Sequence, residues 1–416
     1  MQATRREFVR TAGAGLLTTA TPPLAQSRGR TAAAGRVYDA AVVGAGVFGA
    51  WTAYHLARTG RRVALLDAYG PGNARSSSGG QSRVIRMGYG DQEVYTRWSS
   101  RSLDLWRSLF ADAGEPWLFQ AAGVLWMARG EDPLTTRTLA TLQRLGIPHE
   151  RLSRGELEGR WPQIDFGPNS WGIHEPGSGL LLAFRAVQAV VRMALAAGVA
   201  YLPEAVLPPA GSGPLASIAT RSGRTVSAGA FVFACGPWLA KLFPELLGEL
   251  IFPTRQEVFY FGPAPGDVRF SSPALPVWVD FGEEIYGVPD VEGRGVKVAL
   301  DRHGPAFDPD AGERAATPET LAAVREFVGR RFPGLRGAPL MAAEVCQYEN
   351  TSNGDFLVDR HPERDNVWLV GGGSGHGFKH GPALGEYVAA RLAGTGAVEP
   401  RFSLAGKEKV QKRTVY

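Results

Sequence analysis

The strongest constraint on the fold comes from residues 37–70, VYDAAVVGAGVFGAWTAYHLARTGRRVALLDAYG. An apolar run meets a glycine pattern, a segment of helical length follows, and a second apolar run ends in an acid. The pattern predicts a strand at residues 40–43, a glycine turn at 44–49, a helix that ends at about Thr59 and a second strand at 63–66. A unit of this kind belongs in a parallel sheet with helices on its faces.

The glycines of the turn have the G-x-G-x-x-G spacing that suits an adenine dinucleotide. Gly44 permits the tight turn, Gly46 lets a phosphate approach the backbone, and Gly49 lets helix and strand pack closely. The start of the helix presents unpaired N–H groups to a pyrophosphate, and Asp67 is placed to accept hydrogen bonds from a ribose. These residues predict a site for NAD or FAD, with an ordinary α/β turn as the alternative.

Two further segments favour FAD over NAD. ARSSSGGQSRVIRMGYGD (74–91) is a loop of small residues, including Ser76 and Ser77, and suits a backbone wrapped around a large, flat ligand. NVWLVGGGSGHGFKHGPALGEYVAARLAG (366–394) repeats the order strand, glycine loop, helix. A second helix start aimed at the ligand would stabilise the negative charge on a reduced isoalloxazine ring, whereas a nicotinamide would gain little. In this loop the predicted cofactor contacts are Gly373, Gly375, His376 and Gly377.

The first 35 residues differ from the rest of the chain. TRREFVR (4–10) precedes a short, weakly apolar run and a small-residue site near Ala25. Paired arginines followed by a mild apolar segment predict a twin-arginine export signal, read by the twin-arginine export machinery and leading to the periplasm. A disordered basic tail is the alternative. The segment is too short and too polar to span a bilayer.

Composition excludes other classes of partner. The 416 residues carry 45 Lys and Arg and 40 Asp and Glu, for a net charge of +5, without a long basic block. We therefore expect no nucleic-acid partner. The length and the 44% hydrophobic content allow a large core and two domains interleaved in sequence.

The chain has two cysteines, and Cys346 stands in the polar stretch AEVCQYENTSNGDFLVD. It could fill a gap as a buried, inert side chain, form a disulfide with Cys235, or act as a thiolate that bonds to something else. Cys235 ends an apolar run, where a core cysteine is the expected role. The residues alone leave these alternatives open.

A set of motifs spread along the chain makes a family resemblance specific. They are VVGAGVFGAWTAYHLA, SRVIRMGYG, RWPQI, HEPGSGLL, FVFACGPW, VKVALDRHGPAFDPD and EVCQYENTSNGDFLVDRHPERDNVWLVGGGSGHGFKHGPALGE. Together they resemble the monomeric sarcosine oxidase and N-methyltryptophan oxidase group of flavin amine oxidases, within the D-amino-acid-oxidase-like superfamily. The resemblance covers essentially everything after the export signal.

The resemblance implies roles around a flavin ring. Cys346 matches the cysteine that carries FAD through a thioether to the flavin 8α carbon. Tyr348 lies two residues on, hence on the same face if the stretch is extended. Arg83 would lie near the flavin face, where positive charge favours the reduced ring. Arg86 and Lys379 match the residues that bind the substrate carboxylate, with Lys379 also near the cofactor. From pattern alone, Arg86 could equally form a structural ion pair.

GVKVALDRH (295–303) predicts a strand with Lys297, Ala299 and Asp301 on one face. The resemblance implies that Lys297 activates oxygen, because a fixed cation stabilises the charge that oxygen gains on reduction. A solvent-facing lysine on an edge strand is the alternative. Asp301 departs from the family, which has a histidine at the corresponding place, and the next imidazole here is His303. An acid there would attract a cationic group or accept a proton, which argues against sarcosine itself as the substrate.

These observations predict an α/β fold, a Rossmann-type FAD-binding domain interleaved with a mixed or antiparallel-sheet substrate domain. The expected segments are 1–35 for the signal and spacer; 36–115, 151–245 and 340–400 for the FAD domain; 116–150 and 246–339 for the substrate domain; and 401–416 for a tail. A helix is expected at about 317–331, outside the second sheet.

The predicted activity is an FAD-dependent oxidase of an amino acid or of an N-methyl or cyclic amino acid, with O2 as the electron acceptor. Catalytic roles fall to Lys297, Arg83, Asp301 and Tyr348, and no metal site is predicted. Two alternatives remain, a flavin amine dehydrogenase with another electron acceptor and an exported flavin-binding protein without turnover.

Overall fold

The computed structural model describes residues 37–412. The predicted export signal at 1–35 and the last four residues of the predicted tail lie outside this range. No helix within the described residues is long and apolar enough to cross a bilayer.

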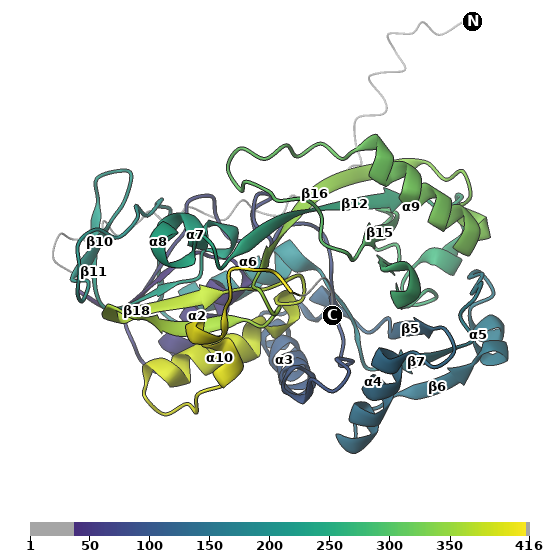
Figure 1. The fold of residues 1–416 in the computed structure, drawn as a ribbon, viewed down its shortest axis with the longest axis horizontal. Coiled ribbons are helices and arrows are strands. Elements are labelled where there is room, and N and C mark those ends of the chain that lie inside the picture. The colour runs from purple at the N-terminus through teal and green to yellow at the C-terminus, as the bar shows by residue number, and fades with distance from the viewer. Residues whose placement is uncertain (1–36, 413–416) are drawn as a thin grey trace, which may run out of the picture. The chain divides into compact units, whose positions relative to one another are not determined.

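The first sheet is mainly parallel and is built around the unit predicted at the start of the chain (Figure 1). Its order is β17 (Leu357–His361), β18 (Arg364–Gly371), β11 (Thr225–Phe233), β1 (Tyr38–Val43), β2 (Val63–Leu66) and β9 (Ala200–Leu202), with β10 (Ser217–Ala219) paired to β11. From β18 to β9 every neighbouring pair runs parallel, and β17 and β10 are antiparallel additions. The central strands are buried on both faces, as their nearly unbroken apolar runs predict.

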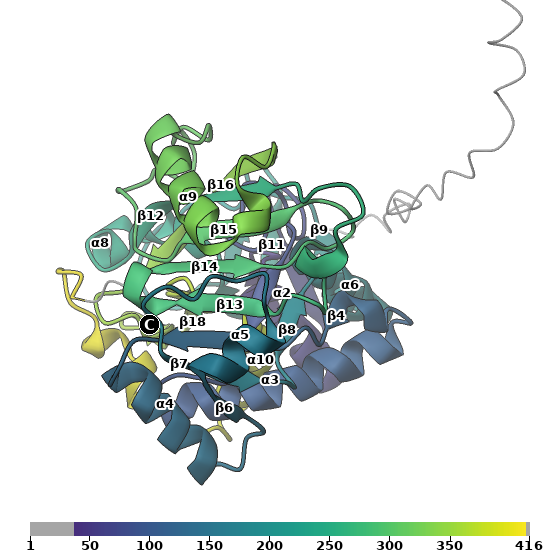
Figure 2. The same ribbon diagram turned by 90° about the vertical axis from the view of Figure 1, so that its right-hand side faces the viewer.

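The second sheet is almost wholly antiparallel, with one parallel pair between β5 and β13 (Figure 2). Its order is β16 (Leu340–Asn350), β12 (Phe252–Phe261), β15 (Val296–Leu300), β14 (Ile285–Val288), β13 (Val277–Asp280), β5 (Val124–Ala128), β7 (Trp171–Glu175) and β6 (Glu150–Ser153). A small third sheet joins β3 (Arg83–Ile85), β8 (Gly179–Leu181) and β4 (Phe119–Gln120).

Helices cover the sheets and complete the cores. Their bounds are α2 (Val47–Arg58), α3 (Glu93–Asp112), α4 (Pro133–Arg144), α5 (Arg154–Arg160), α6 (Ala183–Ala196), α7 (Leu239–Leu242), α8 (Pro244–Leu247), α9 (Pro318–Arg331) and α10 (Gly381–Leu392). α2 packs between α6 and α10. α9 begins after Thr317, whose side chain accepts a hydrogen bond from the Thr320 N–H, and its apolar residues join the core of the second sheet. The predicted helix at 317–331 is confirmed.

The predicted α/β fold with parallel and antiparallel sheets is confirmed. The polar stretch that contains Cys346 is divided between the long strand β16, which ends at Asn350, and the bends that follow it, so the condition that Cys346 and Tyr348 lie in extended chain is met. Sheet membership also groups β6, β7 and β16 with the second sheet, although the expected segments place β7, β16 and all of β6 except Glu150 in the FAD domain. The division of the chain into segments stays a prediction.

Candidate active site

The glycine turn after β1 is close-packed, as its spacing predicts. Gly44 has a φ of +102°, and a Cβ added there would lie 2.3 Å from the backbone oxygen of Ala234. A Cβ on Gly49 would lie 1.8 Å from the oxygen of Gly44, so only glycine lets α2 pack this closely on β1. Gly46 is the N-cap of α2, and the Val47 N–H is bound by Ser78 Oγ at 3.0 Å.

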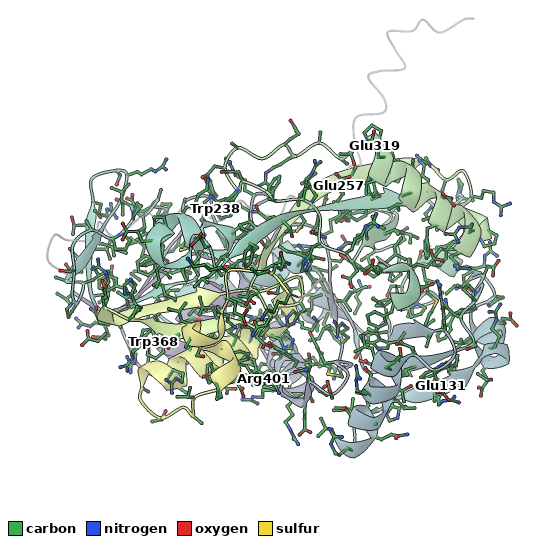
Figure 3. The ribbon with its side chains drawn as sticks, in the orientation of Figure 1. Glu131, Trp238, Glu257, Glu319, Trp368 and Arg401 are labelled. Atoms are coloured by element: carbon green, nitrogen blue, oxygen red, sulfur yellow. The ribbon has the colours of Figure 1, made fainter. Side chains whose placement is uncertain are left out.

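The loops that follow parallel strands meet at one edge of the first sheet. Gly44 follows β1, Asp67 follows β2, Cys235 follows β11 and Gly373 follows β18, and all of them line one cavity of about 400 Å³. The carboxyl ends of parallel strands are the usual place for a nucleotide in an open α/β sheet. Trp238, labelled in Figure 3, also lines this larger cavity, and its Nε1 donates to Asp310 Oδ1 at 2.7 Å.

Most of the predicted cofactor contacts line the larger cavity. They are Gly44, Gly46, Asp67, Ser76, Ser77, Arg83, Cys346, Gly373, Gly375 and Gly377. Polar side chains line this cavity along its length, among them Asp67, Ser76, Ser77, Gln347 and Glu349. They can meet the hydroxyl and phosphate groups of an elongated ligand. The residues present therefore fit FAD.

Asp67 also binds the backbone of the two loops around it. Its carboxylate accepts hydrogen bonds from the N–H groups of Ala45, Tyr69 and Gly70 at 2.7, 2.8 and 2.7 Å. These bonds tie the glycine turn to the loop after β2. Burial nevertheless raises the pKa of this carboxyl. Its bond to a ribose stays a prediction.

A smaller cavity of about 80 Å³ adjoins the larger one. Residues that line both are Arg83, Tyr348, Gly375 and Phe378. The predicted residues that line the smaller cavity and not the larger one are Arg86, Lys297, Asp301, His376 and Lys379. Aromatic rings from Trp126, Phe281 and Tyr286 form much of the remaining wall. The structure thus brings all of the predicted catalytic and substrate-binding residues to the wall of the smaller cavity.

Lys297 is buried, with 3% of its surface exposed, and β15 lies between β12 and β14. The alternative of a solvent-facing lysine on an edge strand is therefore wrong. Its Nζ donates to the backbone oxygen of Ser82 at 3.0 Å. Burial, with the nearby charge of Arg83, lowers the pKa of Lys297 to about 7.

Arg83 is fixed by the backbone around it. Its guanidinium donates to the carbonyl oxygens of Ser77, Gly79 and Ser82, each at 2.8 Å. Its Nη2 also lies 3.5 Å from Cys346 Sγ. The contact places a permanent positive charge beside the sulfur.

Arg86 and Lys379 are connected through Tyr89. The Arg86 guanidinium lies 4.1 Å from the centre of the Tyr89 ring and 4.8 Å from that of Trp126, and it donates to the Gly88 oxygen. Lys379 Nζ donates to the Tyr89 hydroxyl at 2.8 Å. No carboxylate pairs with Arg86 among the ion pairs of the described residues, which disfavours the structural ion-pair alternative.

Sequence reasoning missed Glu175, a buried carboxylate that holds the Arg86 segment in place. Its oxygens accept from the N–H groups of Met87 and Gly88 at 2.7 and 2.9 Å and from Trp126 Nε1 at 2.7 Å. Ser178 Oγ donates to it at 2.6 Å. Glu175 and Ser178 both stand in the motif HEPGSGLL, but Met87, Gly88 and Trp126 lie far away in sequence. Sequence reasoning also missed Tyr286, whose pKa burial raises to about 12.

Asp301 directly follows β15, and its N–H donates to the Glu284 oxygen at 2.7 Å. Its side chain lines the smaller cavity together with His303 and Tyr348. The ring centres of His303 and Tyr348 are 6.1 Å apart. An acid and an imidazole therefore occupy the wall where the family resemblance implies a histidine.

Both cysteines are free thiols, so the alternative of a Cys235–Cys346 disulfide is wrong for this structure. The expected core role of Cys235 holds only in part. Its side chain packs against an apolar core cluster and its Sγ contacts the Val43 oxygen at 3.4 Å, but it also lines the larger cavity.

Comparison with known proteins agrees with this geometry. The chain is 31% identical over 375 residues to the monomeric sarcosine oxidase of Bacillus sp. (strain NS-129), covering 88% of this chain and 95% of that enzyme. It is 31% identical over 359 residues to the N-methyl-L-tryptophan oxidase of Salmonella arizonae, covering 85% and 94%. The crystal structure of L-proline dehydrogenase from P. horikoshii shares the fold, with a TM-score of 0.77, 20% identity, and coverage of 89% and 97%.

The family model described as FAD dependent oxidoreductase matches residues 39–391. This match spans both sheets, and it includes the glycine turn after β1, the loop after β18 and the residues of the smaller cavity. The predicted flavoprotein oxidoreductase is confirmed at this level. The chain belongs to the DAO family of FAD dependent oxidoreductases.

Proposed function

We propose that this protein oxidises an amino acid, or an N-methyl or cyclic amino acid, at a C–H bond next to nitrogen and passes the electrons to O2. The observation that carries the proposal is the smaller cavity, where Arg86 and Lys379 stand among aromatic walls beside the space that fits FAD. The names of the sarcosine and N-methyl-L-tryptophan oxidases at 31% identity support the same class of substrate.

Arg86 and Lys379 would bind the substrate carboxylate. The guanidinium offers a flat fork of donors and the ammonium a point charge, so together they select an amino acid over a simple amine. The rings of Tyr89 and Trp126 contact Arg86, and Glu175 accepts hydrogen bonds from Trp126 and from the N–H groups just after Arg86, so the guanidinium is positioned before a substrate arrives. Binding therefore costs little reorganisation.

The walls of the smaller cavity would exclude water around the reacting C–H bond. When bound, FAD supplies the two-electron acceptor that takes a hydride from the substrate and returns the electrons to O2, giving H2O2. The oxidised substrate is an imine, and water converts it to a carbonyl compound and an amine. Lys297, held on Ser82, would stabilise the negative charge that oxygen gains.

The experiment is anaerobic mixing of the purified protein with N-methyl, cyclic and primary amino acids. We expect loss of the flavin absorbance near 450 nm, then its return with one H2O2 per turnover when air is admitted. Bleaching without peroxide would indicate a dehydrogenase with another acceptor. Absence of bleaching with every amine would leave the non-catalytic flavin-binding protein and end the oxidase proposal.

We further propose that FAD is attached through Cys346. The support is the position of Cys346 Sγ on the wall of the larger cavity and its 3.5 Å contact with the Arg83 guanidinium. Attachment would exchange the Cys346 S–H bond and one C–H bond of the 8α methyl group for a C–S bond, and the two hydrogens released would reduce one O2, the acceptor of the proposed reaction, to H2O2. Acid precipitation should give a yellow pellet and a flavin mass on the Cys346 peptide. A colourless pellet with free FAD in the supernatant would contradict this attachment.

We also propose export through the twin-arginine pathway to the periplasm. The support is the sequence TRREFVR and the mild apolar run after it. Cell fractionation should recover the protein in the periplasm, and replacing Arg5 and Arg6 together with lysine should retain it in the cytoplasm. Equal distribution of the two forms would contradict the proposal.

A further inference from the structure

Glu349 is a buried acid on the wall of the larger cavity, and the proposed reaction does not use it. It lies near the end of β16, three residues after Cys346, and only 5% of its surface is exposed. One carboxyl oxygen, Oε1, has no hydrogen-bond partner. A buried acid with an unsatisfied oxygen is costly, and because the same side chain lines the cavity, Glu349 is a candidate to bind a group of the ligand there.

The glycine loop after β18 wraps closely around this side chain. A Cβ added to Gly371 would lie 2.4 Å from Glu349 Oε1, and the backbone oxygen of Glu349 accepts from the Ser374 N–H at 2.9 Å. The N–H groups of Gly372 and Gly373 also act on the carboxyl. The carboxyl thus lies where this loop begins, at the same sheet edge as the glycine turn that contains Gly44.

The charge state of Glu349 follows from its surroundings. Burial raises its pKa to about 8, although the N–H groups of Gly372 and Gly373 act to lower it. The Cys235 thiol lies close enough to Glu349 to sense its charge. The pKa of Cys235 is raised first by burial and then by the charges of Asp67 and Glu349. An added negative charge here would also repel the phosphates of a dinucleotide, so the neutral acid suits this cavity.

We propose that Glu349 is a cofactor-binding residue that, as a neutral carboxylic acid, donates a hydrogen bond to an oxygen atom between the isoalloxazine ring and the adenosine of FAD. That oxygen belongs either to the ribityl chain or to the pyrophosphate. A neutral carboxyl has one donor and keeps an acceptor oxygen, so it satisfies both the ligand and the N–H groups of the glycine loop. Binding of FAD then draws a proton from solution whenever the carboxyl is ionised beforehand. The inference rests on the proposed use of FAD at this site.

The test uses the full chain with Cys346→Ser as the reference, because FAD can then be removed and added back whether or not a covalent bond forms in the natural protein. Glu349→Gln is added to the reference, and Glu257→Gln is the matched control. Glu257 lies on β12, the neighbour of β16, and is labelled near the beginning of α9 in Figure 3. Its Oε2 accepts from Thr317 N–H and Oγ1, each at 3.0 Å, outside both cavities.

The dissociation constant for FAD is measured by quenching of flavin fluorescence at pH 7 and pH 9. For the reference and for Glu257→Gln we expect it to rise about tenfold between these values, because an acid with a pKa of about 8 must regain its proton to bind. With Glu349→Gln the constant should be the same at both values, since the amide donates throughout. A tenfold rise that persists in Glu349→Gln would overturn the proposal.

Proton uptake gives a measurement that needs no change at Glu349. At pH 8 in weak buffer with a pH indicator, the reference should take up about half a proton per FAD bound. No uptake would overturn the inference even if Glu349→Gln failed to fold. If the natural protein carried no flavin, the proposed function would end as well. FAD binding by the reference without pH dependence or proton uptake would end the inference alone.

A second probe, ADP, identifies the oxygen. ADP carries the pyrophosphate without the ribityl chain, so an equal pH dependence for ADP and FAD would assign the bond to the pyrophosphate. A pH dependence of the dissociation constant seen with FAD and not with ADP would assign the hydrogen bond to the ribityl chain. Either result supports the proposal, whereas flat profiles with both probes would contradict it.

Discussion

The two cavities are built from different parts of the polypeptide. The larger one is walled by glycines and backbone where parallel strands of the first sheet end, and few of its predicted contacts depend on a long side chain. The smaller one is walled by charged and aromatic side chains that come from the second sheet, from β3 of the third sheet and from the loop after β18. Backbone geometry can be read from a local motif. A site formed by side chains from distant segments can differ from its relatives at a single position. Asp301 is an example, because the family resemblance implies a histidine at that place.

The most severe way to break the larger cavity is Gly49→Ala. The new Cβ would meet the Gly44 oxygen at 1.8 Å, so α2 must move away from β1. We expect a loss of about 3 kcal/mol or more in the free energy of unfolding, together with loss of bound flavin. The melting temperature and the ratio of flavin to protein measure both effects.

Gly155→Ala is the control, because it lies in α5 and a Cβ there meets nothing within 4 Å. It should leave flavin content unchanged and stability equal or slightly higher. A Gly49→Ala protein with normal flavin content would contradict the account of the turn.

The next largest effect concerns oxygen. With Lys297→Met we expect flavin reduction by substrate without air to continue, and the rate of reoxidation by O2 to fall about 100-fold or more. Since burial lowers the pKa of Lys297 to about 7, the cation is present below that value and lost above it. Reoxidation in the unchanged protein should therefore slow as the pH rises through about 7, and stopped-flow absorbance measures this rate.

Lys407→Met is the matched control, because Lys407 is also buried, with its pKa lowered to about 8, but bonds the Arg401 oxygen outside both cavities. It should reoxidise normally at every pH. If Lys297→Met did the same, Lys297 would have no part in the reaction with oxygen.

A smaller effect is expected from Arg86→Lys, which keeps the charge and removes the flat guanidinium. The KM for amino acid substrates should rise about 10- to 100-fold, while kcat falls less, because a lysine cannot make the paired bonds to a carboxylate. Arg360→Lys is the control, since Arg360 lies 5.0 Å from the ring centre of Trp368, labelled in Figure 3, and outside both cavities. Equal KM values for the two variants would remove Arg86 from the substrate site.

The smallest effect sharpens the question of substrate choice. Asp301→Asn removes one negative charge from the smaller cavity. We expect kcat/KM for N-methylaspartate to rise about three- to fivefold and that for N-methyllysine to fall by a similar factor, the size of one partly screened charge interaction. Asp165→Asn, outside both cavities, should change neither value. Unchanged selectivity in Asp301→Asn would show that this acid does not face the substrate side chain.

The sequence predicts the first sheet and the larger cavity well, because both depend on local spacing. The turn from Gly44 to Gly49 is an example, and its strand, helix and terminal acid lie where the pattern indicates. The smaller cavity is predicted only through the family resemblance. Glu175 and Glu349 escaped prediction because what makes each of them notable is a fold property: one carboxylate is fully paired by distant N–H groups, and the other is buried with an unpaired oxygen.

β16 has a consequence for laboratory evolution of this enzyme. Residues 346–349 line the larger cavity in succession, and Tyr348 also lines the smaller one. Random libraries that diversify this strand in search of new substrates would yield many colourless clones, because the same residues line the cavity that fits the yellow cofactor. Diversity is better drawn from the hairpin of β13 and β14, which contributes Val279, Phe281 and Tyr286 to the smaller cavity and none of the residues lining the larger one.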